Sequence, residues 1–246
     1  MADYDNRVIR GARSAEAGLI DSGLRAHMLR IYNYMLVGLT LTGATAYAAA
    51  NTSFGQLFFQ ASASGRQSLT GLGLVVLLGT FGLGFWLILG INRMSAATAQ
   101  LLFWTYAALF GVALAPIFWV YTDGSIATTF FITAATFGSM SLWGYTTRSD
   151  LSGMGSFLLM GLIGVIIAMV VNMFLHSAMI MFVVSVAGVL IFTGLTAYDT
   201  QMLKEMYSAN DDGTIAGRKA VYGALMLYLD FINLFRFLLY FLGNRR

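Results

Sequence analysis

Two apolar segments near the C-terminal end of the chain decide the fold: Gly194-Leu195-Thr196-Ala197-Tyr198-Asp199-Thr200-Gln201 and Leu225-Met226-Leu227-Tyr228-Leu229-Asp230-Phe231-Ile232-Asn233-Leu234-Phe235. A short charged turn separates them, and each segment contains one aspartate among apolar residues. A charged side chain in hydrocarbon costs about 2.5–3.5 kcal/mol on insertion scales, so such a residue indicates a functional site. Two aspartates on consecutive helices indicate a pair.

The composition is that of a membrane protein. Of the 246 residues, 58% are hydrophobic and 10% are charged, whereas a soluble domain is about 25% charged, and the mean hydropathy is +0.74. The apolar runs are continuous rather than alternating, which favours helices over a barrel. We therefore predict an all-α polytopic membrane protein, with a polar tail at residues 1–30 and one membrane domain at residues 31–246.

Several classes of function are excluded or disfavoured. The chain has no cysteine, so it has no disulfide or thiolate chemistry. His27 and His176 are far apart and lack the spacing of zinc ligands. The net charge of +3 comes mostly from arginines at the chain ends, which in a membrane protein report topology rather than nucleic-acid binding. No Ser-His-Asp set or phosphate-binding glycine loop is evident, so we predict neither an enzyme nor a bound cofactor.

The spans follow a polar tail. From Leu19 the apolar residues recur at helical spacing, which predicts either an amphipathic lead-in at the membrane surface or simply the cytoplasmic start of the first helix. A hydrocarbon core of about 30 Å requires about 20 apolar residues. On this basis we predict seven transmembrane helices, at residues 32–50, 72–91, 101–120, 125–145, 157–175, 178–202 and 221–242.

Lysine and arginine in the short loops predict the orientation. With the N-terminus in the cytoplasm, ten such residues lie inside and three outside. The inner set is the five arginines of the tail, Arg93, Arg148, Lys204, Arg218 and Lys219, and the outer set is Arg66, Arg245 and Arg246. For seven spans the C-terminus is then outside. The terminal arginine pair would favour the inner side, which leaves a re-entrant last helix open.

Asp199 and Asp230 are the candidate site. On adjacent antiparallel helices, counted from Asp212 in the turn, they are 13 and 18 residues away, so their depths differ by about 7 Å. Two carboxylates in contact at low dielectric cannot readily both ionise, and we expect them to share one proton. Such a pair is a proton switch. The alternative is that each aspartate only hydrogen-bonds a neighbouring helix.

Polar neighbours extend this candidate site. Thr196 lies one turn before Asp199 and Asn233 one turn after Asp230, on the same helix faces. Carboxylate, amide and hydroxyl oxygens suit calcium, and two carboxylates alone make a weak, transient metal site at Asp199 and Asp230. Such weak binding is what ion permeation requires.

Arg93, at the cytoplasmic end of the second span, is a candidate latch. If it bridges a carboxylate, protonation of the acid removes its partner and favours a rearrangement. The alternative is an arginine that extends to the lipid headgroups. Arg236, beyond Asp230, is the other candidate partner. The remaining polar residues are interpreted as a turn residue, Asp123, and as solvated loop residues, Asp150, His176, Asp211 and Asp212.

The stretch from Asp21 to Arg25, leading into Tyr32-Asn33-Tyr34-Met35, together with the two aspartate segments resembles the Bax inhibitor-1 family in its bacterial YccA-like branch. The resemblance covers essentially the whole chain. It implies a seven-helix bundle with a central C-terminal helix, acting as a pH-sensitive calcium leak channel in a bacterial inner membrane. It also implies a di-aspartyl sensor at Asp199 and Asp230 and an arginine latch at Arg93.

Three functions compete at this point. The first is the calcium channel, with calcium as the permeant ion and the lipid bilayer as its surroundings. The second is an intramembrane aspartyl protease, which is disfavoured because Tyr228-Leu229 precedes Asp230 where a Gly-x-Gly-Asp pattern would be expected. The third is an interaction protein whose N-terminal tail modulates a membrane quality-control protease complex. None of the three involves nucleic acid.

Overall fold

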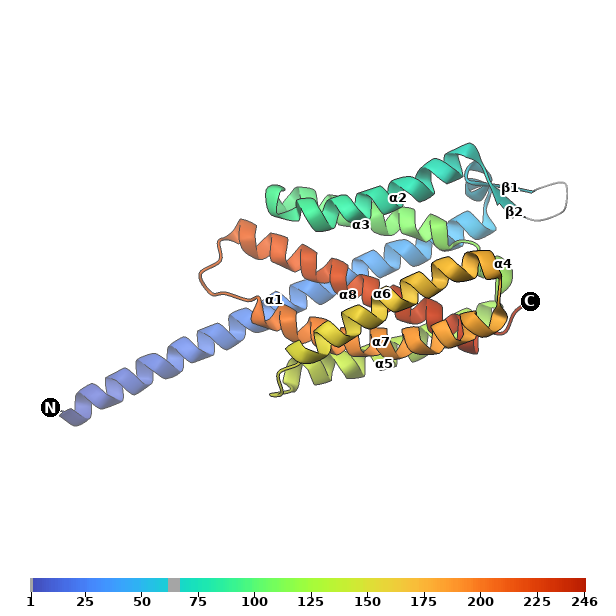
Figure 1. Ribbon diagram of the computed structural model, residues 1–246. Coiled ribbons are helices and arrows are strands. Elements are labelled where there is room, and N and C mark those ends of the chain that lie inside the picture. The colour runs from blue at the N-terminus through green and yellow to red at the C-terminus, as the bar shows by residue number, and fades with distance from the viewer. Residues whose placement is uncertain (1, 62–66) are drawn as a thin grey trace.

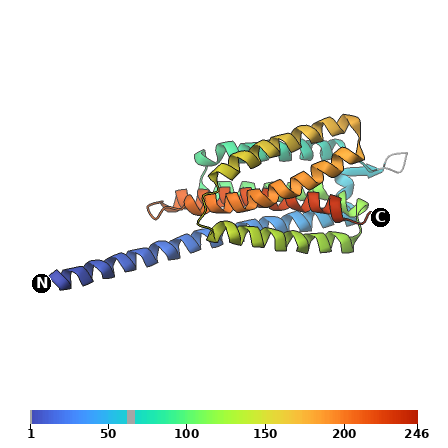
Figure 2. The same ribbon diagram turned by 60° about the horizontal axis from the view of Figure 1, so that its bottom comes forward.

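The structure is a computed structural model that describes residues 2–61 and 67–246; for residues 2–21 it describes the backbone alone. Within these ranges, seven long helices run roughly along one common axis (Figures 1 and 2). They are α1 (Ala2–Asn51), α2 (Gly71–Gly90), α3 (Ala96–Leu114), α5 (Asp123–Thr146), α6 (Ser152–Leu175), α7 (Ala178–Glu205) and α8 (Gly213–Leu242). The predicted helical class is confirmed.

Short polar side chains mark where many of these helices begin. The side chains of Thr70, Ser95, Thr122, Ser177 and Asp212 each accept a hydrogen bond from a backbone N–H in the first turn of the following helix. Such caps satisfy donors that the helix itself leaves free, and each stabilises its helix by about 1 kcal/mol. The chain therefore encodes helix starts locally, before any packing.

The first helix is longer than the predicted first span. Helix α1 is continuous from Ala2 to Asn51, and its N-terminal half projects beyond the other helices (Figure 1). Met28 and Ile31 are buried in the core and Leu24 packs against it. These apolar side chains of the predicted lead-in therefore face the protein, and they continue into the first span without a break.

The connection after α1 is folded rather than irregular. It contains a 3-10 helix, η1 (Ser53–Leu57), and two short antiparallel strands, β1 (Phe59–Ala61) and β2 (Gln67–Leu69), with Phe59 opposite Leu69. Phe58 and Phe59 are buried against Val112, Ala115 and Trp119, so they pack on protein. Arg66, which entered the orientation argument, lies outside the described residues.

The predicted third span divides near its end. Helix α3 stops at Leu114, and α4 (Ile117–Val120) follows after Pro116. Proline has no backbone N–H to continue the hydrogen-bond ladder, and its ring clashes with the preceding turn. Between the C-terminal end of α2 and the beginning of α3, the chain forms a second 3-10 helix, η2 (Ile91–Arg93).

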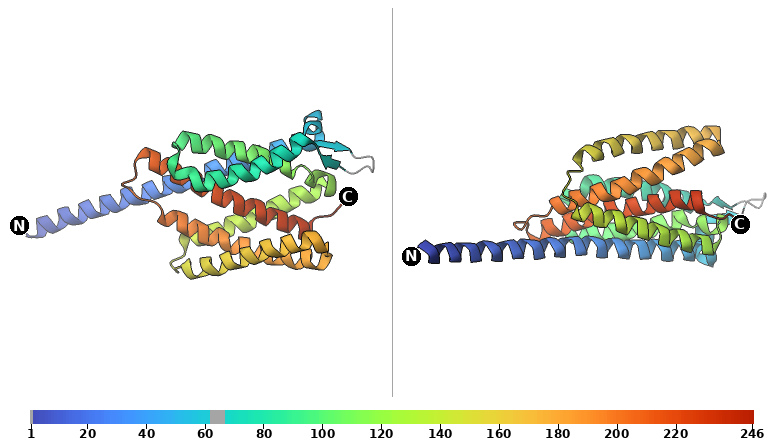
Figure 3. Two further views of the ribbon diagram at one scale, coloured as in Figure 1. Left: turned by 45° about the horizontal axis from the view of Figure 1, so that its top comes forward. Right: turned by 90° about the horizontal axis from the view of Figure 1, so that it is seen from below.

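Helix α8 packs against α1, α3, α5 and α7. In contrast, α2 packs mainly against α3, and α6 packs mainly against α7. The left view of Figure 3 shows α8, in red, between the α2–α3 pair and the α6–α7 pair. A larger share of α8 is buried than of any other candidate span in the described part of the chain. The packing therefore surrounds the second aspartate segment with protein.

Six helices in the described ranges are long and apolar enough to cross a membrane: α2, α3 with α4, α5, α6, α7 and α8. The second half of α1, predicted as the first span, is not among them. It carries several threonines, and the hydroxyls of Thr40, Thr42 and Thr45 donate to carbonyls one turn earlier in the same helix. These polar groups lower its hydropathy although they are satisfied within the protein.

Candidate functional site

The structure brings Asp199 and Asp230 together. Asp199 lies on α7 and Asp230 on the antiparallel neighbour α8, and their carboxyl groups lie within hydrogen-bonding reach of each other. They are 3% and 4% exposed, so both are withdrawn from the surface. A carboxylate only accepts hydrogen bonds, so a bond between two carboxyls requires that one of them carries a proton.

The pair has no other charged partner nearby. Within the described residues, the charged group that acts on each carboxyl is the other carboxyl, and no arginine contributes. The Oδ2 atom of Asp230 is buried and accepts no hydrogen bond from any described residue. Buried polar atoms in proteins are normally satisfied, so this oxygen is free for a proton, a water molecule or a cation.

A cavity of about 630 Å³ adjoins the pair and lies between α6, α7 and α8. Its walls are mostly apolar, with side chains such as Leu162, Met169 and Phe192. The charged side chains in its wall all lie on α7 and α8, where Asp199, Asp230 and Arg236 border the same space as Asn233. A largely apolar cavity with a few converging polar groups is typical of a binding site.

Of the two predicted supporting ligands, the structure places only one beside this cavity. Asn233 lines it, and its amide nitrogen donates to the Leu229 carbonyl at 2.9 Å, which leaves its side-chain oxygen free. Thr196 is fully buried and does not line the cavity; its hydroxyl donates to the Phe192 carbonyl at 2.7 Å. Thr196 lies one helical turn before Asp199, but its hydroxyl is bonded within α7 and does not reach the cavity.

The structure does not bring Arg93 to the aspartates. Arg93 ends η2, where its side chain is exposed, and it belongs to neither of the two ion pairs found among the described residues. Its neighbour Asn92 accepts a hydrogen bond from Arg218, which holds η2 against the beginning of α8. Because α2 packs on α3, this turn stays at the end of the bundle. The expected latch is therefore not formed in this conformation.

Arg236 occupies the cavity that Arg93 does not reach. It lines the cavity together with Asp230 and Asn233, and it too belongs to neither ion pair among the described residues. At 1.5 Å per residue it is about 9 Å beyond Asp230 along α8, and the two border the same space without forming an ion pair. Neither candidate arginine forms a salt bridge with the aspartates.

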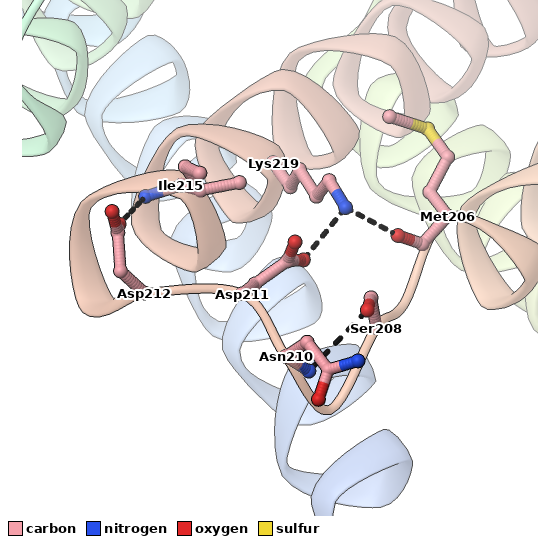
Figure 4. Close-up of polar contacts among 7 residues, drawn as sticks. All are labelled: Met206, Ser208, Asn210, Asp211, Asp212, Ile215 and Lys219. Carbon is pink, nitrogen blue, oxygen red and sulfur yellow. Dashed lines mark hydrogen bonds and ion pairs between the residues drawn. The ribbon is translucent and has the colours of Figure 1, made fainter.

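The turn between α7 and α8 holds the two aspartate helices in register (Figure 4). The Lys219 ammonium donates to the Met206 carbonyl at 2.8 Å and pairs with Asp211 at 2.6 Å, while Asp212 accepts from the Ile215 N–H and caps α8. Asp212 is exposed, as expected for a solvated loop residue, whereas Asp211 is partly buried in its ion pair, so the interpretation of Asp211 as simply solvated was wrong. Both use their carboxylates to organise this turn, a role that depends on contacts with residues of the next helix.

Two tyrosines belong to the site and were missed by the sequence analysis. Tyr198 and Tyr222 line the cavity, Tyr198 beside Gly155 of α6, and Tyr222 close enough to Asp199 for the two to interact electrostatically. The sequence analysis assigned them no role at the site. The helical spacing from Tyr222 to Asp230, about two turns, was the signal that placed both on one face of α8.

Comparison with known proteins finds relatives that match the sequence over its whole length. Residues 24–246 match the family described as "Inhibitor of apoptosis-promoting Bax1". An uncharacterized protein of Rickettsia prowazekii is 45% identical over all of both chains. The Escherichia coli inner membrane protein YbhL is 46% identical over 92% of this chain and 94% of its own length. Neither description mentions a catalytic activity.

The fold and the site thus define a polytopic helical membrane protein with a buried acid pair beside an apolar cavity. The match over residues 24–246 and the relatives at more than 40% identity also identify the family within this class of protein. The chain belongs to the Bax inhibitor-1 family, as the resemblance of its aspartate segments implied.

Proposed function

We propose that this protein is a pH-sensitive, calcium-permeable leak channel of a bacterial inner membrane. The observation that carries the proposal is the buried pairing of the Asp199 and Asp230 carboxyls at the wall of the cavity. The description of the relative YbhL as an inner membrane protein supports the location. Seven crossings, with the second half of α1 as the first and α8 at the centre, complete the proposed architecture.

The proposed gate is the shared proton. While one carboxyl holds it, the hydrogen bond joins α7 to α8 and the pair carries one negative charge. When the proton leaves, two carboxylates in contact at low dielectric repel each other, which favours separation of the two helices. Their oxygens, with that of Asn233, then offer hard ligands that suit calcium, and the small number of ligands keeps its binding weak. A latch by Arg93 would require η2 to move toward the pair.

The test is calcium flux into liposomes that contain the purified protein and an entrapped calcium indicator, measured from pH 6 to pH 8. We expect the flux through the wild type to change with pH, and Asp199→Asn and Asp230→Asn each to flatten that dependence, because an amide cannot take part in the shared ionisation. Asp150→Asn is the matched control, since Asp150 is an exposed loop residue whose cap on Ser152 an asparagine can also form.

Two results would count against the channel. If both variants keep the pH dependence of the wild type, the pair is not the sensor. If no variant carries calcium at any pH, the pair has another role, and the next step is a search for a protease complex that binds the projecting N-terminal half of α1.

A further inference from the structure

The cavity beside the aspartates has a positively charged outer end. Arg236 lies about 9 Å before the end of α8 at Leu242, within the membrane-spanning part of the helix. Its side chain is exposed to the cavity, and neither ion pair among the described residues includes it. An arginine in hydrocarbon is costly and calls for a counter-charge.

A second arginine, Arg245, lies next to two tyrosines of the cavity wall. Arg245 lies over the ring of Tyr240 at 5.2 Å, and Tyr240 and Tyr121 line the outer end of the cavity. The neighbouring Arg246 is already paired with Asp123 at 2.8 Å. In the described part of the chain, Arg236 and Arg245 are therefore the charges left without an acidic partner at this end.

The cavity is shaped as a groove along α8 that faces the lipid. Its lining residues Tyr222 and Tyr240 are separated by about 27 Å along the helix axis, close to the thickness of the hydrocarbon core, about 30 Å. Helix α6, on its far side, packs on α7 rather than on α8. The wall residues Leu159 and Ile166 are 55% and 47% exposed, so the groove is accessible from the surface that the bilayer covers.

The distances along α8 match one leaflet. Asp230 lies about 15 Å from Tyr240 along the axis, which is half of the hydrocarbon core. An acyl chain that enters at the outer rim would therefore end beside the aspartate pair. Arg236 also borders a second cavity of about 130 Å³ between α2, α3 and α8, which is too small for a chain of this length.

We propose that this groove binds an anionic phospholipid of the outer leaflet. Arg236 and Arg245 hold the phosphate, because the arginine fork matches phosphate oxygens and basic pockets between membrane helices recognise lipid headgroups. One acyl chain fills the groove, and its end covers the space beside Asp199 and Asp230. The proposal goes beyond ion permeation and does not depend on it.

The experiment is native mass spectrometry of the full-length protein, released from mixed micelles containing phosphatidylglycerol and phosphatidylcholine with the same acyl chains. We expect wild type to retain phosphatidylglycerol in preference. Arg236→Gln should lower that retention about tenfold, the factor expected for loss of one charge-assisted hydrogen bond, and Arg236→Lys should restore part of it. Arg148→Gln, at an exposed arginine outside the cavity, is the matched control.

A variant of the apolar wall tests the groove independently of the charge. Ile166→Trp adds volume inside the cavity and should lower retention of both lipids. Equal retention of the two lipids by wild type, or unchanged retention by Arg236→Gln, would overturn the proposal. If added oleate is retained and phosphatidylglycerol is not, the site belongs to a free fatty acid, which also overturns the phospholipid assignment.

Discussion

At the scale of single residues, His27 shows how a buried titratable group ties α1 to the end of α7 and the beginning of α8. It is 8% exposed, its ring lies 5.8 Å from that of Tyr207, and its Nε2 has no hydrogen-bond partner among the described residues. Burial lowers the pKa of His27, and the nearby charges of Lys219 and Arg30 lower it further; the Leu203 backbone and Asp211 act in the opposite direction.

This environment predicts a pH dependence of stability. The folded protein favours neutral His27, whereas the unfolded chain takes up the proton at a pH of about 6.5. The contribution of neutral His27 to the free energy of unfolding is therefore complete above that pH. It is lost as the pH falls from there toward the lower pKa of His27 in the folded state. We expect His27→Asn to reduce the loss of thermal stability between pH 7.5 and pH 5, measured by unfolding in detergent.

The comparison with His27→Asn needs a control because the aspartate pair also titrates. His176→Asn changes an exposed histidine whose left-handed backbone, with φ of 50°, an asparagine accepts readily. It should follow the wild-type curve. A His27→Asn curve parallel to the wild type would show that His27 carries no part of the acid sensitivity.

At the scale of helices, the position of Asp199 depends on a close approach between α5 and α7. A Cβ atom added at Gly144 of α5 would lie 2.2 Å from the carbonyl oxygen of Ala197, which is backbone and cannot turn aside. Ala197 precedes Asp199 by two residues on α7. Small residues that allow such approach drive helix association in membranes, where lipid is as apolar as the side chains.

We predict that Gly144→Ala destabilises the protein by about 1–3 kcal/mol, the usual cost of overpacking, and weakens the contact between Asp199 and Asp230 by displacing α7. Gly138→Ala on the same helix is the control, because nothing lies within 4 Å of a Cβ added there. It should be neutral or stabilising by up to about 1 kcal/mol. Unfolding in detergent measures both, and equal stability of the two variants would refute the close approach.

At the scale of the whole molecule, the two ends of the chain lie at opposite ends of the bundle (Figure 1). Helix α8 is unbroken over 30 residues, and the chain after it is bound to the start of α5. The Thr122 N–H donates to the Asn244 carbonyl at 3.1 Å, and the Arg246 N–H donates to the Val120 carbonyl at 3.0 Å. These contacts hold the C-terminus away from the α7–α8 turn.

This arrangement predicts a membrane topology that is directly measurable. Because the chain has no native cysteine, single cysteines report their side without background. We expect Asn210→Cys, in the α7–α8 turn, to react with an impermeant thiol reagent only in inverted inner-membrane vesicles. Gly124→Cys, at the start of α5, should react in intact spheroplasts. Both sites are exposed. Labelling of both positions from one side would refute the proposed orientation.

The sequence by itself determined the class of protein and singled out Asp199 and Asp230 as the candidate site. Long apolar runs leave the backbone no way to satisfy its hydrogen bonds in lipid except within helices, and an aspartate inside such a run is too costly to be incidental. Short polar residues before the runs also determined where many helices begin. These are local properties of the chain, so they required no knowledge of packing.

Only the tertiary structure decided which side chains meet. Helical spacing assigns Thr196 and Asn233 to the faces of the aspartates, yet Asn233 borders the cavity and Thr196 does not, because the packing of neighbouring helices decides which part of each face borders the cavity. The contact of Asp199 with Asp230, and the separation of Arg93 from both, likewise depend on which helices pack together. Residues far apart in the sequence make those contacts, and no pattern within one segment encodes them.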